Sequence, residues 1–324
     1  KLNKKVAYSL LALVVICVAG GSVVGFRMWR ERNPEYSLSK AREAFKNQDF
    51  QTAEQLFGKA YTFTKLDEDK IDILFEMAEF HLTSTEKHEP NWRKALGCWQ
   101  TVLNVNPNHI EARRKLMDYY YQMGDSGGSG AWKMVEEHSS KLLEAFAKTQ
   151  TEPDIEVLMA NARASLEIAR VGTSAFRETL VAKAIADLET LKKKTPDNAR
   201  IYEYLIDATL LKGELEYLKG SAELKDNTST FALKTARDKA QEDVKQIIQQ
   251  AKENASDKSL ANALALEMRV RQAQSDPNLL PAVRKEAEAI AAAFPQSDRI
   301  LAIVSTCYEL HGAMDRRQIG RAHV

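Results

Sequence analysis

Apolar residues recur at helical spacing before three prolines, Pro107, Pro196 and Pro295. Twelve, eight and five residues before each proline, apolar side chains occupy positions that share one face of a helix. The three sets are Ala95, Trp99 and Val102; Ala184, Leu188 and Leu191; and Val283, Ala287 and Ile290. The pattern predicts that each proline follows an amphipathic helix whose apolar stripe is buried.

The segments after the same prolines also share their spacing. The matching positions lie nine, thirteen and seventeen residues after each proline. The three sets are Leu116, Tyr120 and Gly124; Leu205, Thr209 and Gly213; and Val304, Tyr308 and Gly312. We expect a second amphipathic helix in each segment, with the first two positions facing inward. We expect glycine to end that helix, because it takes the left-handed C′ conformation at little cost.

The clearest single unit lies nearer the N-terminus, in SKAREAFKNQDFQTAEQLFGKAY. Ala41 and Ala44 fall on its first predicted helix, and Ala53, Phe57 and Ala60 on its second. Small residues at a helix crossing, with a proline after the second helix, resemble the tetratricopeptide repeat. The resemblance covers residues 35–318 and implies an all-α fold, a right-handed α-α superhelix of stacked helix-turn-helix units.

The spacing between the prolines is longer than regular repeats of this family give, which predicts insertions. We place them at Ser126–Gly130, Val171–Thr179 and Lys219–Ser229. The residues that follow, Thr230–Asn254, read as one long helix.

The N-terminal residues predict a membrane anchor. Val6–Phe26 carries no charged residue and is long enough to cross a bilayer as a helix, after a basic tail at 1–5 and before a linker at 27–34. We favour an uncleaved signal-anchor over a signal peptide cleaved near Ala19. The sequence therefore predicts a single-pass membrane protein, with its body outside the cytoplasm and on the periplasmic side if the source is bacterial.

The other end of the chain departs from the repeat, because residues 297–318 predict a first helix without its second. The last residues, Ile319–Val324 (IGRAHV), back-translate to a common sequencing-adapter read. We interpret 319–324 as a non-native tail, with a genuine polar tail as the alternative.

Composition and motifs argue against chemistry and against nucleic acid. Lys and Arg number 46 and Asp and Glu 45, so no excess of positive charge favours a polyanion. The six histidines form no metal-binding motif, and the Gly-rich stretch before Trp132 does not match a phosphate-binding loop. Cys98 and Cys307 fall in apolar helical patterns and are expected to be buried free thiols. We expect no enzyme, no cofactor and no metal.

In tetratricopeptide repeats the inner surface, formed mainly by the first helix of each unit, binds peptides. By that resemblance the candidate protein-binding residues here are Arg114, Asp118, Tyr121, Glu203 and Asp207. Some family members clamp a terminal carboxylate with Lys and Asn at comparable positions. The acidic residues here depart from that clamp, which argues against a chaperone C-terminal tail as the ligand. Ordinary surface charge is the alternative interpretation.

These observations predict a membrane-anchored scaffold that binds protein or peptide partners along its helical repeats. The alternative is the N-terminal repeat portion of a longer enzyme, or of a secretion or assembly component. The sequence identifies neither the partner nor the oligomeric state.

Overall fold

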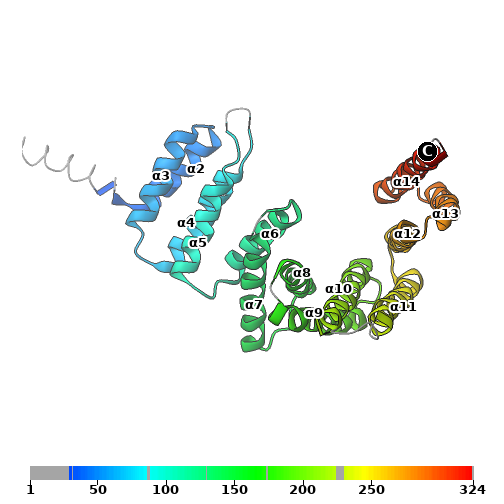
Figure 1. Ribbon diagram of the computed structural model, residues 1–324. Coiled ribbons are helices and arrows are strands. Elements are labelled where there is room, and N and C mark those ends of the chain that lie inside the picture. The colour runs from blue at the N-terminus through cyan, green and yellow to red at the C-terminus, as the bar shows by residue number, and fades with distance from the viewer. Residues whose placement is uncertain are drawn as a thin grey trace, which may run out of the picture. The chain divides into compact units, whose positions relative to one another are not determined.

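The computed structural model describes residues 29–30, 32–85, 88–128, 130–172, 174–223 and 230–322, and within them the chain is built from α-helices (Figure 1). Apart from one isolated bridge between Thr85 and His88, the described residues contain no β-structure. The helices are α2 (Pro34–Lys46), α3 (Phe50–Phe63), α4 (Asp67–Leu82), α5 (Trp92–Val105), α6 (Ile110–Asp125), α7 (Ala131–Thr149), α8 (Ile155–Val171), α9 (Ser174–Lys194), α10 (Ala199–Glu223), α11 (Thr230–Asn254), α12 (Lys258–Ser275), the 3₁₀ helix η2 (Pro277–Leu279), α13 (Leu280–Ala293) and α14 (Asp298–Ala322).

The chain divides into two compact units, Lys1–Tyr119 and Tyr120–Val324, with the boundary inside α6. In the first unit, α2 packs on α3 and α4 packs on α5. The ring of Phe57 lies 5.6 Å from that of Phe80, and both side chains are buried. Ala41 and Ala53 are fully buried in the same cluster, so small residues bring α2 and α3 together as predicted.

The three prolines lie in matching four-residue turns, at 106–109, 195–198 and 294–297. In each turn the amide of the fourth residue donates to the carbonyl of the first, at 3.1, 3.2 and 3.1 Å in chain order. Proline at the second position supplies the φ angle that such a turn needs. The predicted stripe before each turn is also confirmed: eight of its nine residues are buried and Ile290 is half-buried.

The predicted role of the glycines is wrong. Gly213 lies inside α10 and Gly312 inside α14, and Gly124 is still within α6, as its last residue but one. A Cβ on Gly213 would lie 2.5 Å from the Cβ of Ala240, and one on Gly124 would lie 2.7 Å from the ring of Trp132. These two glycines let neighbouring side chains approach closely instead of ending a helix. The predicted inward position of Tyr308 is also wrong, because that side chain is 50% exposed.

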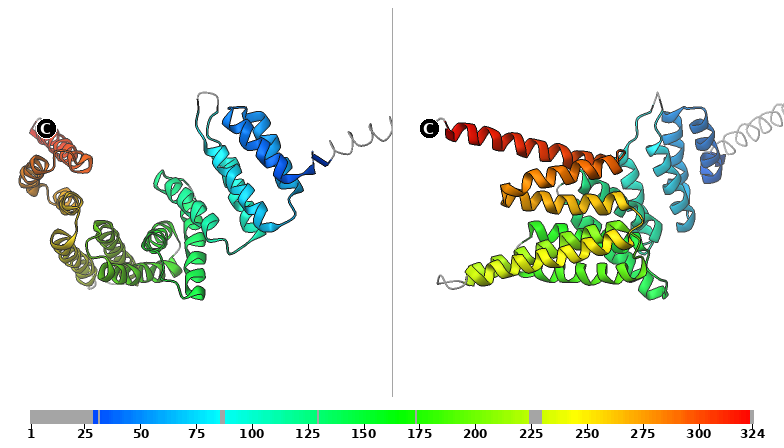
Figure 2. Two further views of the ribbon diagram at one scale, coloured as in Figure 1. Left: turned by 180° about the vertical axis from the view of Figure 1, so that it is seen from behind. Right: turned by 90° about the vertical axis from the view of Figure 1, so that its right-hand side faces the viewer.

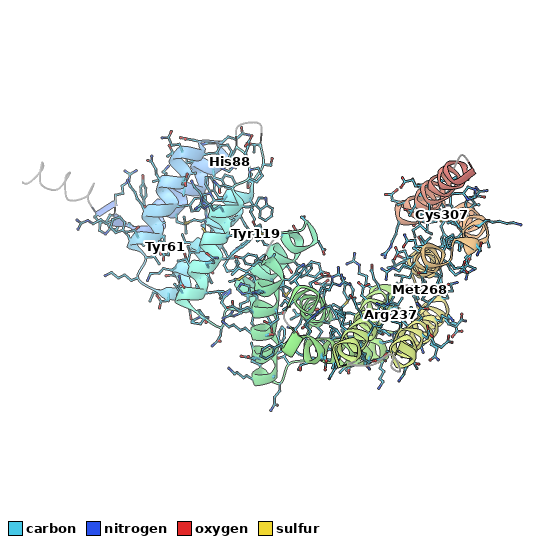
Figure 3. The ribbon with its side chains drawn as sticks, viewed as in Figure 1. Tyr61, His88, Tyr119, Arg237, Met268 and Cys307 are labelled. Carbon is cyan, nitrogen blue, oxygen red and sulfur yellow. The ribbon has the colours of Figure 1, made fainter. Side chains whose placement is uncertain are left out.

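The second unit has its largest core between α8, α9, α10, α11 and α12, and a smaller one between α12, α13 and α14. α11 runs along α10, as the right-hand view of Figure 2 also shows. The guanidinium of Arg237, labelled in Figure 3, lies 3.5 Å from the ring centroid of Tyr217 across this pair. The bounds of α11 match the long helix predicted at Thr230–Asn254.

The predicted insertions have mixed outcomes. The described part of Ser126–Gly130, which is 126–128 and Gly130, lies between α6 and α7, and Gly127 and Gly130 there have positive φ angles of 83° and 77°. Val171–Thr179 is mostly helix instead, because α8 continues to Val171 and α9 begins at Ser174. Of Lys219–Ser229, the first part continues α10 to Glu223, and 224–229 lie outside the described residues.

The predicted membrane helix at 6–26 and the basic tail at 1–5 lie outside the described residues. No described helix is both long and apolar enough to cross a membrane, because the longest ones, α10, α11 and α14, all carry charged residues. The predicted fold class, with a transmembrane helix, is therefore corrected to an all-α fold without a membrane-spanning helix among the described residues. The predicted single-pass localisation, with its periplasmic body, is corrected on the same ground. At the other end, the backbone of 319–322 continues α14.

Candidate functional site

One groove in the second unit gathers side chains from alternate helices, α6, α8, α10, α12 and α14. It consists of two adjoining hollows of about 330 and 440 Å³, both lined by Arg163, Glu203 and Arg299. We call it the arginine groove. Part of its lining is apolar and comes from Ile206, Leu210, Leu264 and Met268. Met268 is labelled on α12 in Figure 3. The groove therefore combines an apolar surface with charged walls.

A closed ring of ion pairs joins α8 to α10 at one wall. Arg163 lies 2.8 Å from Glu167 and 3.0 Å from Asp207, and Arg170 lies 3.0 Å from each of the same two carboxylates. Burial alone would lower the pKa of the Arg163 guanidinium. The two carboxylates beside it outweigh that effect and raise the pKa. The Arg163 guanidinium at the centre of the ring therefore stays charged near neutral pH.

Arg299 ties α14 to two other helices. Its guanidinium donates two hydrogen bonds to the Glu267 carboxylate on α12, at 2.7 and 3.0 Å, and one to Glu203 on α10, at 2.7 Å. The hydrogen bond to Glu267, together with that to Glu203, raises the pKa of Arg299 despite its partial burial. A planar guanidinium suits such forked contacts better than a lysine would.

Two tyrosines line the end of the groove beside α6, and a tryptophan packs against one of them. The hydroxyls of Tyr121 and Tyr204 lie 2.6 Å apart, and Arg163 lies over the ring of Tyr204 at 5.3 Å. Trp132 meets Tyr121 edge to face, with ring centroids 5.2 Å apart. Burial raises the pKa of both tyrosine hydroxyls, so both remain protonated near neutral pH.

Two arginines of the groove remain available to a ligand. Arg200 on α10 and Arg271 on α12 are exposed, and neither forms an ion pair with any described residue. Arg200 lines one hollow and Arg271 the other. The groove can therefore offer a cation in each of its two halves.

The structure brings three of the five predicted site residues together. Tyr121, Glu203 and Asp207 line the arginine groove. Arg114 and Asp118 come earlier on α6 and belong to the first unit, so the structure does not place them in this groove. Arg114 is half-buried and Asp118 is exposed.

Sequence reasoning missed Arg163, Arg170, Glu267 and Arg299. For Arg299 a signal was present, because the residues four positions after the prolines are all charged: Glu111, Arg200 and Arg299. All three line hollows in the structure. Arg163 and Arg170 lie on α8, and the proline before that helix, Pro153, does not share the spacing of the other three, so no pattern pointed to them.

The described residues contain no group of three or more His, Cys, Asp or Glu side chains that could hold a metal ion. Cys98 and Cys307 are buried free thiols, as predicted, and burial raises the pKa of the Cys98 thiol to about 11. A thiol with such a pKa is almost wholly protonated at neutral pH and is a poor nucleophile. The groove offers hydrogen-bonding groups, charges and apolar surface, which are the groups through which proteins bind ligands without covalent chemistry.

No protein-family model matches the chain, and no curated protein matches it in sequence. Among solved structures it is similar to the crystal structure of a tetratricopeptide repeat protein from Parabacteroides merdae, at 10% sequence identity and a TM-score of 0.36. The match covers 85% of this chain and 98% of that one. The described helices, paired around short turns, agree by their own geometry with the predicted helical repeat.

Proposed function

We propose that the chain is an interaction scaffold that binds an extended segment of a partner protein in the arginine groove. The observation that carries the proposal is a pair of adjoining hollows with apolar surface and with charged walls that are paired internally. Each hollow also has one arginine that forms no ion pair with any described residue. An extended segment presents alternating side chains and a row of carbonyl oxygens. Apolar side chains of the segment would contact Leu210 and Leu264, and acidic ones Arg200 and Arg271.

Charge balance supports a peptide over a polyanion. The arginines that line the groove are matched in number by lining carboxylates, among them Asp125 and Asp257 at its rim. A nucleic acid needs a surface with excess positive charge along its backbone. A peptide with a few acidic residues needs only Arg200 and Arg271, which form no ion pair with any described residue.

The first experiment identifies the segment. The photo-crosslinking amino acid benzoylphenylalanine replaces Leu210 in the groove, and in a control it replaces exposed Lys193 on α9. We expect the Leu210 variant to give specific adducts in cells of the source organism, which mass spectrometry maps to one peptide. Equal adducts from both positions would contradict binding in the groove.

The second experiment measures the affinity of the mapped peptide by fluorescence anisotropy. We expect Arg200→Glu with Arg271→Glu to weaken binding about tenfold or more, because two attractive contacts become repulsive. The matched control is Lys148→Glu with Lys193→Glu, which makes the same charge change at exposed residues outside the lining. An equal loss in both variants would show that only overall charge matters.

A further inference from the structure

The first unit has a hollow of its own with the opposite character. It has a volume of about 560 Å³ and lies between α2, α4 and the start of α6. We call it the acidic hollow. Its carboxylates are Glu35 on α2, Asp69, Asp72, Glu76 and Glu79 on α4, and Glu111 on α6. The four on α4 follow one another at spacings of three or four residues, so they form a stripe along one face of that helix.

Most of this negative charge is not paired with a cation among the described residues. Arg42 on α2 binds Glu76, with one hydrogen bond of 2.8 Å. The other five carboxylates form no ion pair with any described residue. The arginine groove differs in this respect, because Glu203, Asp207 and Glu267 are all paired with arginines there.

The stripe is unfavourable for the helix that carries it. Asp72 and Glu76 lie four residues apart, where like charges destabilise a helix. Glu79 lies in the last turn of α4, where the helix dipole favours cations instead. Folding alone would therefore favour neutral or basic residues at these positions. A ligand that supplies positive charge would relieve both effects.

The acidic hollow also offers apolar and aromatic surface. Leu38 and Phe75 line it, and the ring of Phe75 lies 5.3 Å from that of His109. The amide of Ala112 donates to Nδ1 of His109 at 3.2 Å, which fixes the imidazole at the start of α6. A ligand that fits needs both cationic groups and apolar groups.

We propose that the acidic hollow binds a basic, amphipathic segment of a partner protein, with lysines or arginines on the carboxylates and apolar side chains on Leu38 and Phe75. A single metal ion does not fit, because no three His, Cys, Asp or Glu side chains among the described residues are grouped so that they could hold one. A nucleic acid is excluded by the sign of the charge. The proposal concerns a different unit from the arginine groove and stands independently of the function proposed there.

The test uses the full chain and a short fluorescein-labelled peptide of repeating Lys-Leu-Lys-Ala sequence. Fluorescence anisotropy compares it with a Glu-Leu-Glu-Ala peptide and with a Lys-Ser-Lys-Ala peptide. We expect binding only when the probe has both its cations and its leucines. We also expect affinity to fall when NaCl is raised from about 0.05 to about 0.3 M, because salt screens exposed charges. Equal binding of the serine probe would overturn the apolar part of the proposal, and equal binding of the acidic probe would overturn all of it.

The decisive variant is Asp72→Asn with Glu79→Gln, which removes two unpaired carboxylates from the hollow. We expect about tenfold weaker binding of the Lys-Leu probe, since each exposed ion pair contributes up to a few-fold in affinity. The matched control is Glu68→Gln with Glu89→Gln, which removes two exposed carboxylates of the same unit that do not line the hollow. We expect the control to change affinity less than twofold, and an equal loss in both variants would overturn the site.

Stability measurements separate binding from folding. We expect Asp72→Asn with Glu79→Gln to raise the thermal unfolding midpoint slightly, because it removes the repulsion along α4. If that variant unfolds instead, Glu35→Gln with Glu111→Gln tests the same hollow from two other helices, with the same expected loss of affinity. Self-association of the wild type that either variant abolishes would make a second copy the occupant and overturn the proposal.

Discussion

Replacing Gly213 by alanine tests whether the close packing of α10 on α11 requires a glycine at this position. The new Cβ would lie 2.5 Å from the Cβ of Ala240, whereas carbon atoms in contact normally lie about 3.5–4.0 Å apart. The helices must therefore separate by about 1 Å. Ala240 has no flexible end that could move aside, since its Cβ is fixed to the backbone of α11.

The expected magnitude follows from two opposing effects. Overpacking a helix contact costs about 1–3 kcal/mol, and a clash between two Cβ atoms belongs at the upper end. Alanine inside a helix is about 1 kcal/mol more favourable than glycine. We therefore expect Gly213→Ala to lower the free energy of unfolding by about 2 kcal/mol. Gly312→Ala, at the same repeat position with nothing within 4 Å, should raise it by up to about 1 kcal/mol.

The assay is urea unfolding followed by far-ultraviolet circular dichroism, with amide exchange along α10 and α11 because helical arrays can unfold locally. Adding Ala240→Gly to Gly213→Ala should restore stability to near that of the wild type. The two changes should then depart from additivity by about 3 kcal/mol. A glycine that ended a helix would show no such rescue. Additive effects, or a Gly213→Ala variant as stable as the wild type, would refute the packing argument.

Two further predictions concern the first unit. Trp99 is 4% exposed on α5, so Trp99→Ala should lower the unfolding free energy by about 3–5 kcal/mol in urea unfolding, and a loss under about 1 kcal/mol would contradict its core position. Burial lowers the pKa of His81 in the folded protein below its usual 6.5. The unfolded chain therefore binds a proton at His81 more tightly than the folded protein does. The free energy of unfolding is highest above pH 6.5, where His81 is neutral in both states, and it decreases as pH falls toward the folded-state pKa. His81→Asn should make the unfolding free energy less dependent on pH below 6.5, by at most about 1.4 kcal/mol per pH unit, and identical pH profiles for the two proteins would contradict this.

The sequence predicted the elements that depend on local physics. Helical periodicity and the turn preference of proline located the stripe around Trp99 and the turn at Pro196, and both follow from residues close together in the chain. The long helix at Thr230–Asn254 was found for the same reason, since its sequence contains neither proline nor glycine. These features needed no knowledge of which helices are neighbours.

The features that were missed depend on contacts between distant residues. A glycine after an apolar stripe has the same sequence pattern whether it ends a helix or admits a neighbour. Only the position of Ala240, on the next helix, shows that Gly213 does the second. The ring of Arg163, Arg170, Glu167 and Asp207 likewise joins residues on α8 and α10, and Pro153 before α8 does not share the apolar spacing that made the other segments comparable.

The position four residues after each proline links the fold to both proposed sites. It is the second residue of the helix after the turn and is not part of the buried stripe, so its side chain can change without disturbing the core. Glu111 at this position lines the acidic hollow, and Arg200 and Arg299 line the arginine groove. One repeated backbone position thus carries opposite charge in the two units. The repeated turn and stripe are the same whichever charge stands at this position, so the two proposed sites differ in charge on the same backbone arrangement.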